Sequence, residues 1–235
     1  MFDFTDRVAL VTGASGALGG AVCRRLLDAG AAVAALDRKP ERLLAAYADA
    51  GGRFSAHAVD LADPAAVEAA VAAAIARHGR IDHVFNLAGA FAADGPVEAT
   101  PLETWRKLMD ANFHSTLHVC RAAVPELARR GGGTIVNVGS RASLGGDANV
   151  AAYAVAKTAV LRLTESLAAE GKRRGVRVNC VLPGTIDTPA NRAAMPDADT
   201  STWVEPDALV DALFFLSSPA ARAVHGAALP VFGLG

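Results

Sequence analysis

Tyr153 and Lys157 are the residues whose types and spacing most directly suggest chemistry. They lie four positions apart in a stretch with helical periodicity, so their side chains share one helix face. A free tyrosine has a pKa of about 10, too high for a base at neutral pH, and a nearby lysine cation would lower it by stabilising the tyrosinate. Such a pair can exchange a proton with a carbonyl or alcohol oxygen while a hydride moves at the adjacent carbon.

Two polar residues upstream can complete a site around this pair. Ser140 follows a predicted strand, and its hydroxyl can hold the substrate oxygen by a hydrogen bond. Asn112 lies within a long predicted helix. Taken singly, each residue is equally typical of a turn, and pairs spaced like Tyr153 and Lys157 arise by chance on many helices. The four together, in this order behind a nucleotide-binding turn, predict an oxidoreductase.

The nucleotide-binding turn is a glycine-rich segment after the first predicted strand. Glycines there let the backbone turn sharply and approach a pyrophosphate, whose charge is attracted by the amino terminus of the next helix. The residues of this turn predicted to contact a cofactor are Gly13, Ser15, Gly16, Ala17, Leu18 and Gly19. The position of the turn between a strand and a helix strengthens a signal that is weak alone.

Acidic residues end the second and third predicted strands. Asp37 can hydrogen-bond both ribose hydroxyls of NAD and repel the 2′-phosphate of NADP, so the sequence favours NAD over NADP. A helix cap or a solvated loop acid is the alternative for Asp37, and Arg38 can stack on adenine or pair with a phosphate. Asp60 can meet the adenine amino group with Leu61 beside the ring, although a lone Asp at this place is also typical of a turn.

Short apolar segments alternate with helical periodicity along the whole chain. The predicted strands are residues 8–11, 32–36, 54–59, 81–87, 134–138, 176–181 and 227–231. The predicted helices are residues 18–29, 40–50, 64–78, 102–130 in one or two pieces, 150–174 and 205–216. Strands that are apolar on both faces and alternate with helices indicate a parallel sheet covered on both sides. We expect an α/β fold: a single doubly wound Rossmann domain over residues 1–235, with about seven strands and a ligand crevice at their carboxyl ends.

The composition agrees with such a domain and narrows its partners. Of the 235 residues, 52% are hydrophobic and 20% are charged, and the formal net charge is -1. A near-neutral chain without a basic run gives no electrostatic reason to bind nucleic acid or an anionic membrane. The sequence has no recognisable signal peptide and no apolar stretch long enough to span a bilayer. We expect a small-molecule substrate and a cytoplasmic location.

Cysteines and histidines predict no metal site. Cys23, Cys120 and Cys180 are far apart in apolar surroundings, which is typical of buried small hydrophobes rather than of disulfides or metal ligands. The six histidines form no metal-ligand pattern. His114 and His118 are one turn apart on a predicted helix and can bind zinc, but a helix surface or a subunit interface is the favoured interpretation.

In combination, these motifs resemble the short-chain dehydrogenase/reductase family over essentially the whole chain. The matching segments are residues 12–19, 86–89, 153–157 and 183–188, together with Asn112 and Ser140. The resemblance implies that Tyr153 is the acid/base, that Lys157 holds the cofactor ribose and tunes Tyr153, and that Ser140 orients the substrate oxygen. It also implies that Asn112 anchors a water in a proton relay to Lys157.

The resemblance implies further cofactor contacts beyond the glycine turn. Residues after the fourth strand would line the adenosine side and steady the sheet, and the backbone of Ile186 with the side chain of Thr188 would hold the nicotinamide carboxamide. The cofactor residues predicted on this ground are Asn86, Ala88, Gly89, Tyr153, Lys157, Pro183, Gly184, Ile186 and Thr188.

The glycine spacing departs from the family pattern. The usual turn has glycines at the first, fifth and seventh places counted from Gly13, whereas this chain has Gly16 at the fourth place and Ala17 at the fifth. That spacing also occurs in a longer, epimerase-like branch of the family, so an epimerase or dehydratase is one alternative. A non-catalytic NAD-binding redox sensor is another, although such sensors tend to lose the tyrosine or the lysine.

The segment 182–199, with Trp203 nearby, resembles that of quinonoid dihydropteridine reductases, which makes such an enzyme a further alternative. Those reductases lack a serine at the place of Ser140, because a quinonoid ring needs no hydroxyl to hold a carbonyl oxygen. We therefore favour a small carbonyl or alcohol substrate. The candidate pocket and lid residues are Phe91, Arg141, Leu144, Asn191, Arg192, Met195 and Trp203.

Small apolar residues on the predicted helices 102–130 and 150–174 suggest subunit contacts. In the family these two helices pack against their counterparts in a neighbouring subunit, so we predict a homodimer or homotetramer. The small residues concerned are Ala111, Ala122, Ala123, Ala151, Ala152 and Ala159.

Overall fold

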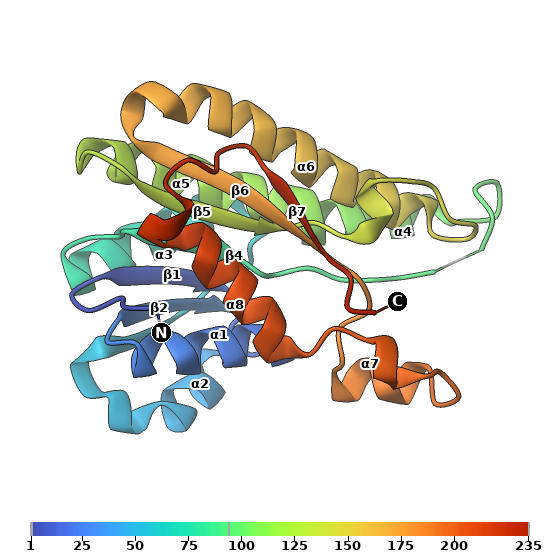
Figure 1. Cartoon of the computed structure of the whole chain (residues 1–235), viewed down its shortest axis with the longest axis horizontal. Helices are drawn as coiled ribbons and strands as arrows, with labels where there is room; N and C mark the ends of the chain where they lie inside the picture. Colours follow the sequence, from blue (N-terminus) through green and yellow to red (C-terminus); the bar gives the residue numbers. More distant parts are fainter. Residues whose placement is uncertain (1, 94, 235) are drawn as a thin grey trace.

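A seven-stranded parallel sheet organises the chain in the computed structural model, which describes residues 2–93 and 95–234. The strands are β1 (Val8–Thr12), β2 (Ala32–Asp37), β3 (Phe54–Ala58), β4 (His83–Asn86), β5 (Gly133–Val138), β6 (Val176–Pro183) and β7 (Ala228–Val231). Their order is β3-β2-β1-β4-β5-β6-β7 (Figure 1). The predicted fold class is confirmed. Because the winding reverses between β1 and β4, the carboxyl ends of these two strands form the switch point where this fold places ligands.

Helices cover both faces of the sheet (Figure 1). One face carries α1 (Ala17–Asp28), α2 (Pro40–Ala46) and α8 (Pro206–Ser217), and the other carries α3 (Pro64–His78), α5 (Ser115–Arg129) and α6 (Ala151–Gly171). The two apolar layers are separate: Leu26 and Leu213 belong to the first, and Val71 and Leu127 to the second. The sheet is therefore held between two cores, which keeps its strand ends in fixed positions.

The helix predicted over residues 102–130 is divided in the structure. It begins as α4 (Leu102–Leu108), passes through a π-helical turn at Met109–His114, and continues as α5. Asn112 lies in the π-helical turn and donates a side-chain hydrogen bond to the Leu108 carbonyl at 2.9 Å. Turns of this kind are frequent at functional sites, because the extra residue re-aims a side chain.

Other predicted boundaries need smaller corrections. The predicted helix 150–174 ends as α6 at Gly171, and a 3-10 turn follows at Lys172–Arg174. The predicted helix 40–50 ends as α2 at Ala46, before a 3-10 turn at Ala48–Arg53 in which Gly51 has a φ of 55°. The short helix α7 (Pro189–Ala194) was not predicted, although Thr188 followed by proline is a helix-start signal.

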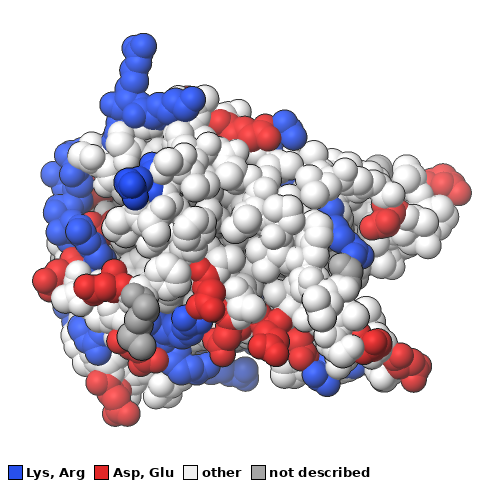
Figure 2. Space-filling view, in the orientation of Figure 1, with Lys and Arg blue, Asp and Glu red and all other residues white. Residues whose placement is uncertain are grey.

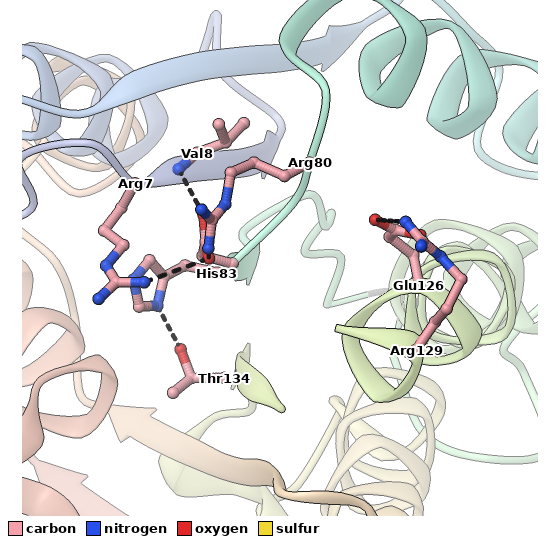
Figure 3. Close-up of polar contacts among 8 residues, drawn as sticks. Arg7, Val8, Arg80, His83, Glu126, Arg129 and Thr134 are labelled. Atoms are coloured by element: carbon pink, nitrogen blue, oxygen red, sulfur yellow. Dashed lines mark hydrogen bonds and ion pairs between the residues drawn. The ribbon is translucent and has the colours of Figure 1, made fainter. Parts of the chain in front are cut away.

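Buried charges at the amino edge of the sheet tie strands together. Asp82 accepts a hydrogen bond from the Val8 amide at 2.9 Å and forms ion pairs with Arg80 and Arg7. In Figure 3 these two guanidinium groups converge beside Val8. His83 Nδ1 lies 2.7 Å from the Thr134 hydroxyl, and burial lowers the pKa of this imidazole to about 4. This cluster joins β1, β4 and β5 at the end remote from the switch point.

The sequence also led to predictions about the cysteines, membrane spans and metal ligands. Cys23, Cys120 and Cys180 are buried and free, as predicted. Within residues 2–93 and 95–234, no helix is both long and apolar enough to cross a membrane. The same residues contain no group of three or more His, Cys, Asp or Glu side chains arranged to hold a metal ion.

Candidate active site

The glycine turn brings the end of β1 close to the segment after β4. Gly13 has a φ of 64°, and a Cβ added there would lie 2.9 Å from Ala88 Cα. A Cβ on Gly19 would lie only 2.1 Å from the Gly13 carbonyl oxygen, so any larger residue would displace α1 from the turn. Both glycines are therefore required by close approach of the backbone. Ala17, where the family pattern has glycine, is exposed at the start of α1, so its methyl group is accommodated.

Asp37 closes β2 and faces the same turn. Its Oδ2 accepts hydrogen bonds from the Ser15 amide at 3.0 Å and the Ser15 hydroxyl at 2.7 Å, and its Oδ1 accepts one from the Lys39 amide at 3.2 Å. Burial acts to raise the pKa of this carboxyl, but these hydrogen bonds outweigh burial and hold the pKa below its usual value. The side chain is therefore an ionised acceptor at the cavity wall.

A cavity of about 890 Å³ opens at the switch point. The predicted residues that line it are Gly13, Ser15, Gly16, Asp37, Arg38, Asp60, Leu61, Ala88, Gly89 and Phe91. On this side the surface is hollowed between two projections, one carrying α7 and the other formed by the loops after β4 and β5 (Figures 1 and 2). The cavity is large enough for a small-molecule ligand or cofactor.

Several predicted cofactor residues do not line this cavity. Leu18 and Gly19 lie behind the turn in α1, and Asn86 is buried in the sheet. Asn86 donates to the Asn137 side chain at 2.8 Å, while its own Oδ1 has no hydrogen-bond partner among the described residues. Thr12 supports the same region, because its hydroxyl accepts hydrogen bonds from the amides of residues 87 and 88. These side chains steady the cavity wall from beneath.

Tyr153 and Lys157 lie on α6, beyond the far end of the cavity. Lys157 is only 5% exposed, its Nζ donates to the Val138 carbonyl at 2.9 Å, and it lies 5.9 Å from the centroid of the Tyr153 ring. Burial lowers the pKa of Lys157 to about 8. Burial also raises the pKa of Tyr153, against the opposing effect of a hydrogen bond with Ser140. At neutral pH the tyrosine is therefore protonated and the lysine is charged.

Ser140 is held in place by the turn that follows β5. Its hydroxyl oxygen accepts a hydrogen bond from the Ala142 amide at 3.2 Å, and its own amide donates to the Ser143 hydroxyl at 3.3 Å. This reciprocal pattern caps the 3-10 turn Arg141–Ser143. The hydroxyl that hydrogen-bonds Tyr153 thus has a fixed backbone position.

Asn112 and Lys157 approach each other in the space beside Gly89. The Asn112 side chain is fully buried and exchanges hydrogen bonds with both the amide and the carbonyl of Ala90, at 3.2 and 2.9 Å. A Cβ on Gly89 would lie 2.7 Å from Asn112 Oδ1 and 3.3 Å from Lys157 Nζ. Gly89 therefore leaves the space in which the two side chains face each other, and the structure brings together all four residues predicted to be catalytic.

Phe91 connects the cavity with the tyrosine. Its side chain is 66% exposed, lines the cavity, and lies edge-to-face with the Tyr153 ring at a centroid distance of 5.0 Å. Sequence reasoning named Phe91 only as a pocket candidate. It missed the contribution of α4 and the π-helical turn to the cavity wall, which comes from Thr104, Lys107, Leu108, Asp110 and Ala111. No motif marks these residues in the sequence, because they reach the cavity only through the packing of α4 and the π-helical turn against the loop after β4.

Residues of the segment after β6 form hydrogen bonds and ion pairs mainly with one another. Ile186 pairs with Val204 in an isolated bridge, and its carbonyl accepts a hydrogen bond from the Asn191 side chain at 2.8 Å. The Thr188 hydroxyl accepts from the Asn191 amide, and Arg192 forms a bidentate ion pair with Asp187.

None of the predicted residues Pro183, Gly184, Ile186 and Thr188 lines the cavity described above. The candidate lid residue Met195, at the end of α7, is 40% exposed. A contact between this segment and a nicotinamide ring therefore stays a prediction.

The donor and acceptor set of the cavity fits a dinucleotide. Gly89 leaves space that a Cβ would fill beside Asn112 and Lys157. No described side chain caps the α1 amino terminus, so its first amides can meet a phosphate. The ionised Asp37 provides an acceptor for ribose hydroxyls at the other wall. Fold and site together define a nucleotide-binding α/β enzyme with a tyrosine–lysine pair beside its cofactor cavity.

A family model of the short chain dehydrogenases matches residues 7–199. The chain belongs to the short-chain dehydrogenase family, and it is an oxidoreductase of alcohol or carbonyl groups. A D-threitol dehydrogenase of Mycolicibacterium smegmatis is 36% identical over 246 residues, which cover 99% of this chain and 94% of the relative. A 2-(R)-hydroxypropyl-CoM dehydrogenase of Xanthobacter autotrophicus is 37% identical over 250 residues, covering 97% and 98%.

Solved structures share the fold over nearly the whole chain. A short-chain type dehydrogenase/reductase from Mycobacterium ulcerans has a TM-score of 0.93 at 32% identity, covering 99% of this chain and 90% of that one. A gluconate 5-dehydrogenase from Burkholderia cenocepacia, in complex with NADP and tartrate, has a TM-score of 0.91 at 33% identity, covering 99% and 96%. An NAD+-bound xylitol dehydrogenase has a TM-score of 0.90 at 27% identity, covering 98% and 99%. The family thus uses both nicotinamide dinucleotides.

Proposed function

We propose that this protein transfers a hydride between NAD and a small secondary alcohol or its ketone, with Tyr153 as the acid/base. The observation that carries the proposal is the pair of Tyr153 and the buried Lys157, with Ser140 hydrogen-bonded to the tyrosine, beside a cavity walled by an ionised aspartate. An intact serine favours carbonyl chemistry over reduction of a quinonoid pterin. The named relatives act on hydroxyl groups, which supports the same class.

Tyr153 is suited to donate a proton to a ketone oxygen. Because burial raises the pKa of its hydroxyl, the proton is present at neutral pH. Ser140 would hold the same oxygen and stabilise the charge that develops on it. The bound nicotinamide would supply the hydride. In the oxidative direction Tyr153 must lose its proton, and the Lys157 cation favours the tyrosinate that results.

Lys157 and Asn112 would connect Tyr153 with solvent, so that a proton reaches the tyrosinate after ketone reduction and leaves toward solvent when an alcohol is oxidised. The two side chains face each other across Gly89, where a bridging water has polar partners on both sides. Lys157 Nζ already donates to the Val138 carbonyl, which fixes its position and leaves its other protons for a ribose hydroxyl and this water. Val138 is thus a positioning partner for the lysine.

We infer that NAD is the preferred dinucleotide. The carboxylate of Asp37 lies at the cavity wall between Ser15 and Lys39, where it would accept from ribose hydroxyls. An added 2′-phosphate would meet its negative charge. Arg38 also lines the cavity and would oppose part of this repulsion.

We also propose that the chain acts as one NAD-binding domain in a cytoplasmic homo-oligomer. The helices predicted to form the interface, α5 and α6, lie on the same face of the sheet. Two of the small residues predicted there, Ala123 and Ala152, cannot contribute, because they are buried inside the single chain. Size-exclusion chromatography with light scattering tests the assembly, and a stable monomer contradicts it.

A substrate panel tests the proposed activity. Purified protein is offered NADH or NADPH with ketones, quinones and a quinonoid pterin, and cofactor oxidation is followed by absorbance. We expect turnover of at least one ketone with NADH. Cofactor binding without turnover of any substrate would favour a redox sensor, and turnover of the pterin alone would replace the carbonyl assignment.

A further inference from the structure

Phe91 is the one large apolar side chain, among those that the structure describes as exposed, that also lines the cofactor cavity. Its side chain is 66% exposed and meets the Tyr153 ring edge-to-face at a centroid distance of 5.0 Å. Single exposed apolar residues are ordinary on protein surfaces. Phe91 differs from them because it touches the proposed acid/base, which covers only part of its ring and leaves the rest open.

The cavity wall that carries Phe91 has no hydrogen-bonding side chain. Residues 88–92 read Ala-Gly-Ala-Phe-Ala, and all five line the cavity. The backbone amide and carbonyl of Ala90 are both engaged by the Asn112 side chain. A polyhydroxylated substrate needs a partner for each hydroxyl group that it buries, and this wall offers no side chain for that purpose. The wall suits a hydrocarbon group instead.

Charged side chains that line the cavity from α4 and the π-helical turn are engaged with neighbours. Lys107 Nζ lies 3.4 Å from a carboxylate oxygen of Glu103, and Asp110 Oδ1 lies 2.7 Å from His114 Nδ1. These groups are therefore less available to hydroxyl groups of a substrate. The exposed part of the Phe91 ring has no such competing partner among the ring contacts described.

The segment around α7 shows the same division between engaged polar groups and open apolar ones. Asn191 donates to a backbone carbonyl of its own segment at 2.8 Å, and Arg192 is paired with Asp187 through two nitrogens. Met195, at the end of α7, is 40% exposed, and its flexible thioether side chain can adapt to an apolar surface. The projection with α7 and the projection with the loop after β4 flank the hollow (Figures 1 and 2), so each side carries an open apolar side chain.

We propose that the substrate is a secondary alcohol or ketone that carries an aryl or cyclic hydrocarbon group, and that Phe91 selects it by packing against that group. This inference rests on the proposed hydride transfer and names its substrate class. Packing a ring against Phe91 removes apolar surface of both from water, and an aromatic pair gains further from the orientation of its rings. Because Phe91 touches Tyr153, a ring packed there lies beside the proposed proton donor.

Steady-state kinetics with NADH measures the contribution of Phe91. The ratio of kcat/KM for acetophenone to kcat/KM for acetone reports the selection of the ring, because a disturbance of Tyr153 affects both ketones. We expect the wild type to favour acetophenone over acetone and over 1,3-dihydroxyacetone. Phe91→Ala should lower the acetophenone-to-acetone ratio about tenfold, the size of one lost aromatic contact. Phe91→Tyr keeps the ring and should retain most of the ratio.

Val97→Ala is the matched control for the loss of an exposed apolar side chain. Val97 lies in the same loop and is 61% exposed, but it does not line the cavity. This variant should keep the wild-type ratio. The proposal is overturned if the wild type prefers 1,3-dihydroxyacetone or pyruvate to acetophenone, or if Phe91→Ala keeps the ratio of the wild type.

Calorimetry separates this inference from the hydride transfer on which it rests. Protein loaded with NADH is titrated with 1-phenylethanol, an alcohol that cannot pass a hydride to a reduced cofactor. We expect saturable binding that Phe91→Ala weakens about tenfold. Such binding without turnover of any ketone would contradict the hydride transfer and leave the apolar site intact, whereas the absence of saturable binding would overturn the role of Phe91.

Discussion

The two edges of the sheet both bury charged groups, but they treat them differently. At the amino edge, Asp82 has two guanidinium partners and a backbone amide, and the neighbouring His83 is bonded to Thr134 (Figure 3). At the carboxyl edge, Lys157 is almost fully buried and its Nζ donates to a backbone carbonyl. Among the described residues, no carboxylate pairs with this lysine.

The difference separates a structural site from a chemical one. A buried charge that is paired and hydrogen-bonded holds strands together, and removing one partner leaves the others unsatisfied. A buried charge without a counterion raises the free energy of the fold, and it persists where it acts on a neighbour such as Tyr153. Substitutions at the amino edge should therefore change stability, and those at the carboxyl edge should change turnover.

The largest expected effect is on catalysis, from Tyr153→Phe. The substitution keeps the ring that packs against Phe91 and removes only the hydroxyl. Loss of a general acid typically lowers the rate by about 10²–10⁴, and we expect kcat/KM on a ketone to fall about 10³-fold, or roughly 4 kcal/mol. Thermal unfolding should stay close to that of the wild type. Full activity of this variant on a ketone would exclude Tyr153 as the proton donor.

The next largest effect is on stability, from Asp82→Ala at the amino edge. It leaves the Val8 amide and the Arg80 guanidinium without their acceptor. Breaking a buried ion pair costs about 3 kcal/mol or more, so urea unfolding should show a loss of this size. The kcat of the folded variant at low temperature should match the wild type. A large fall in kcat without a loss of stability would remove the distinction between the two edges.

Lys157→Met should raise stability and lower kcat, whereas Asp82→Ala should lower stability and leave kcat unchanged. Because the pKa of Lys157 is lowered to about 8 from 10.5, the unfolded chain binds more protons between these values. The cost of burying the charge is present in full below about pH 8 and disappears as the pH rises toward 10.5.

The shift corresponds to about 3 kcal/mol at most. We expect the Lys157→Met variant to be up to this much more stable than the wild type at pH 7, with the difference vanishing near pH 10.5, and to have a lower kcat. Urea unfolding at both pH values measures this. A variant that is less stable than the wild type at pH 7 would show that Lys157 contributes to the fold as Asp82 does.

The sequence alone predicted the sheet because each strand is apolar on both faces and is followed by a helical pattern. It predicted the bounds of α3 since Asp63 caps that helix and Gly79, with a φ of 77°, ends it. It did not predict the π-helical turn, because Asn112 satisfies the Leu108 carbonyl only through a tertiary arrangement with Ala90. Local periodicity in the sequence does not predict such a tertiary contact.

The site likewise contains features that local spacing predicts and contacts that it does not predict. That Tyr153 and Lys157 share one helix face follows from helix geometry alone, since residues four apart lie on the same side of a helix. The acceptor for Lys157 is the carbonyl of Val138 on another element, and Phe91 reaches Tyr153 from the loop after β4. Contacts between elements distant in the chain depend on how the elements pack, which spacing does not encode.

Asp37→Ala should give the smallest effect and sharpen the comparison between the two edges. Asp82 is paired with two guanidinium groups, whereas the Asp37 carboxylate accepts hydrogen bonds from Ser15 and Lys39 and lies at the cavity wall. Removing the charge should relax the preference for NADH over NADPH about 30-fold, or roughly 2 kcal/mol, measured as the ratio of kcat/KM values. Asp60→Ala, at the same wall, is the matched control and should affect both cofactors alike. A wild type that already prefers NADPH would mean that the positive charge of Arg38 outweighs the negative charge of the Asp37 carboxylate at this wall.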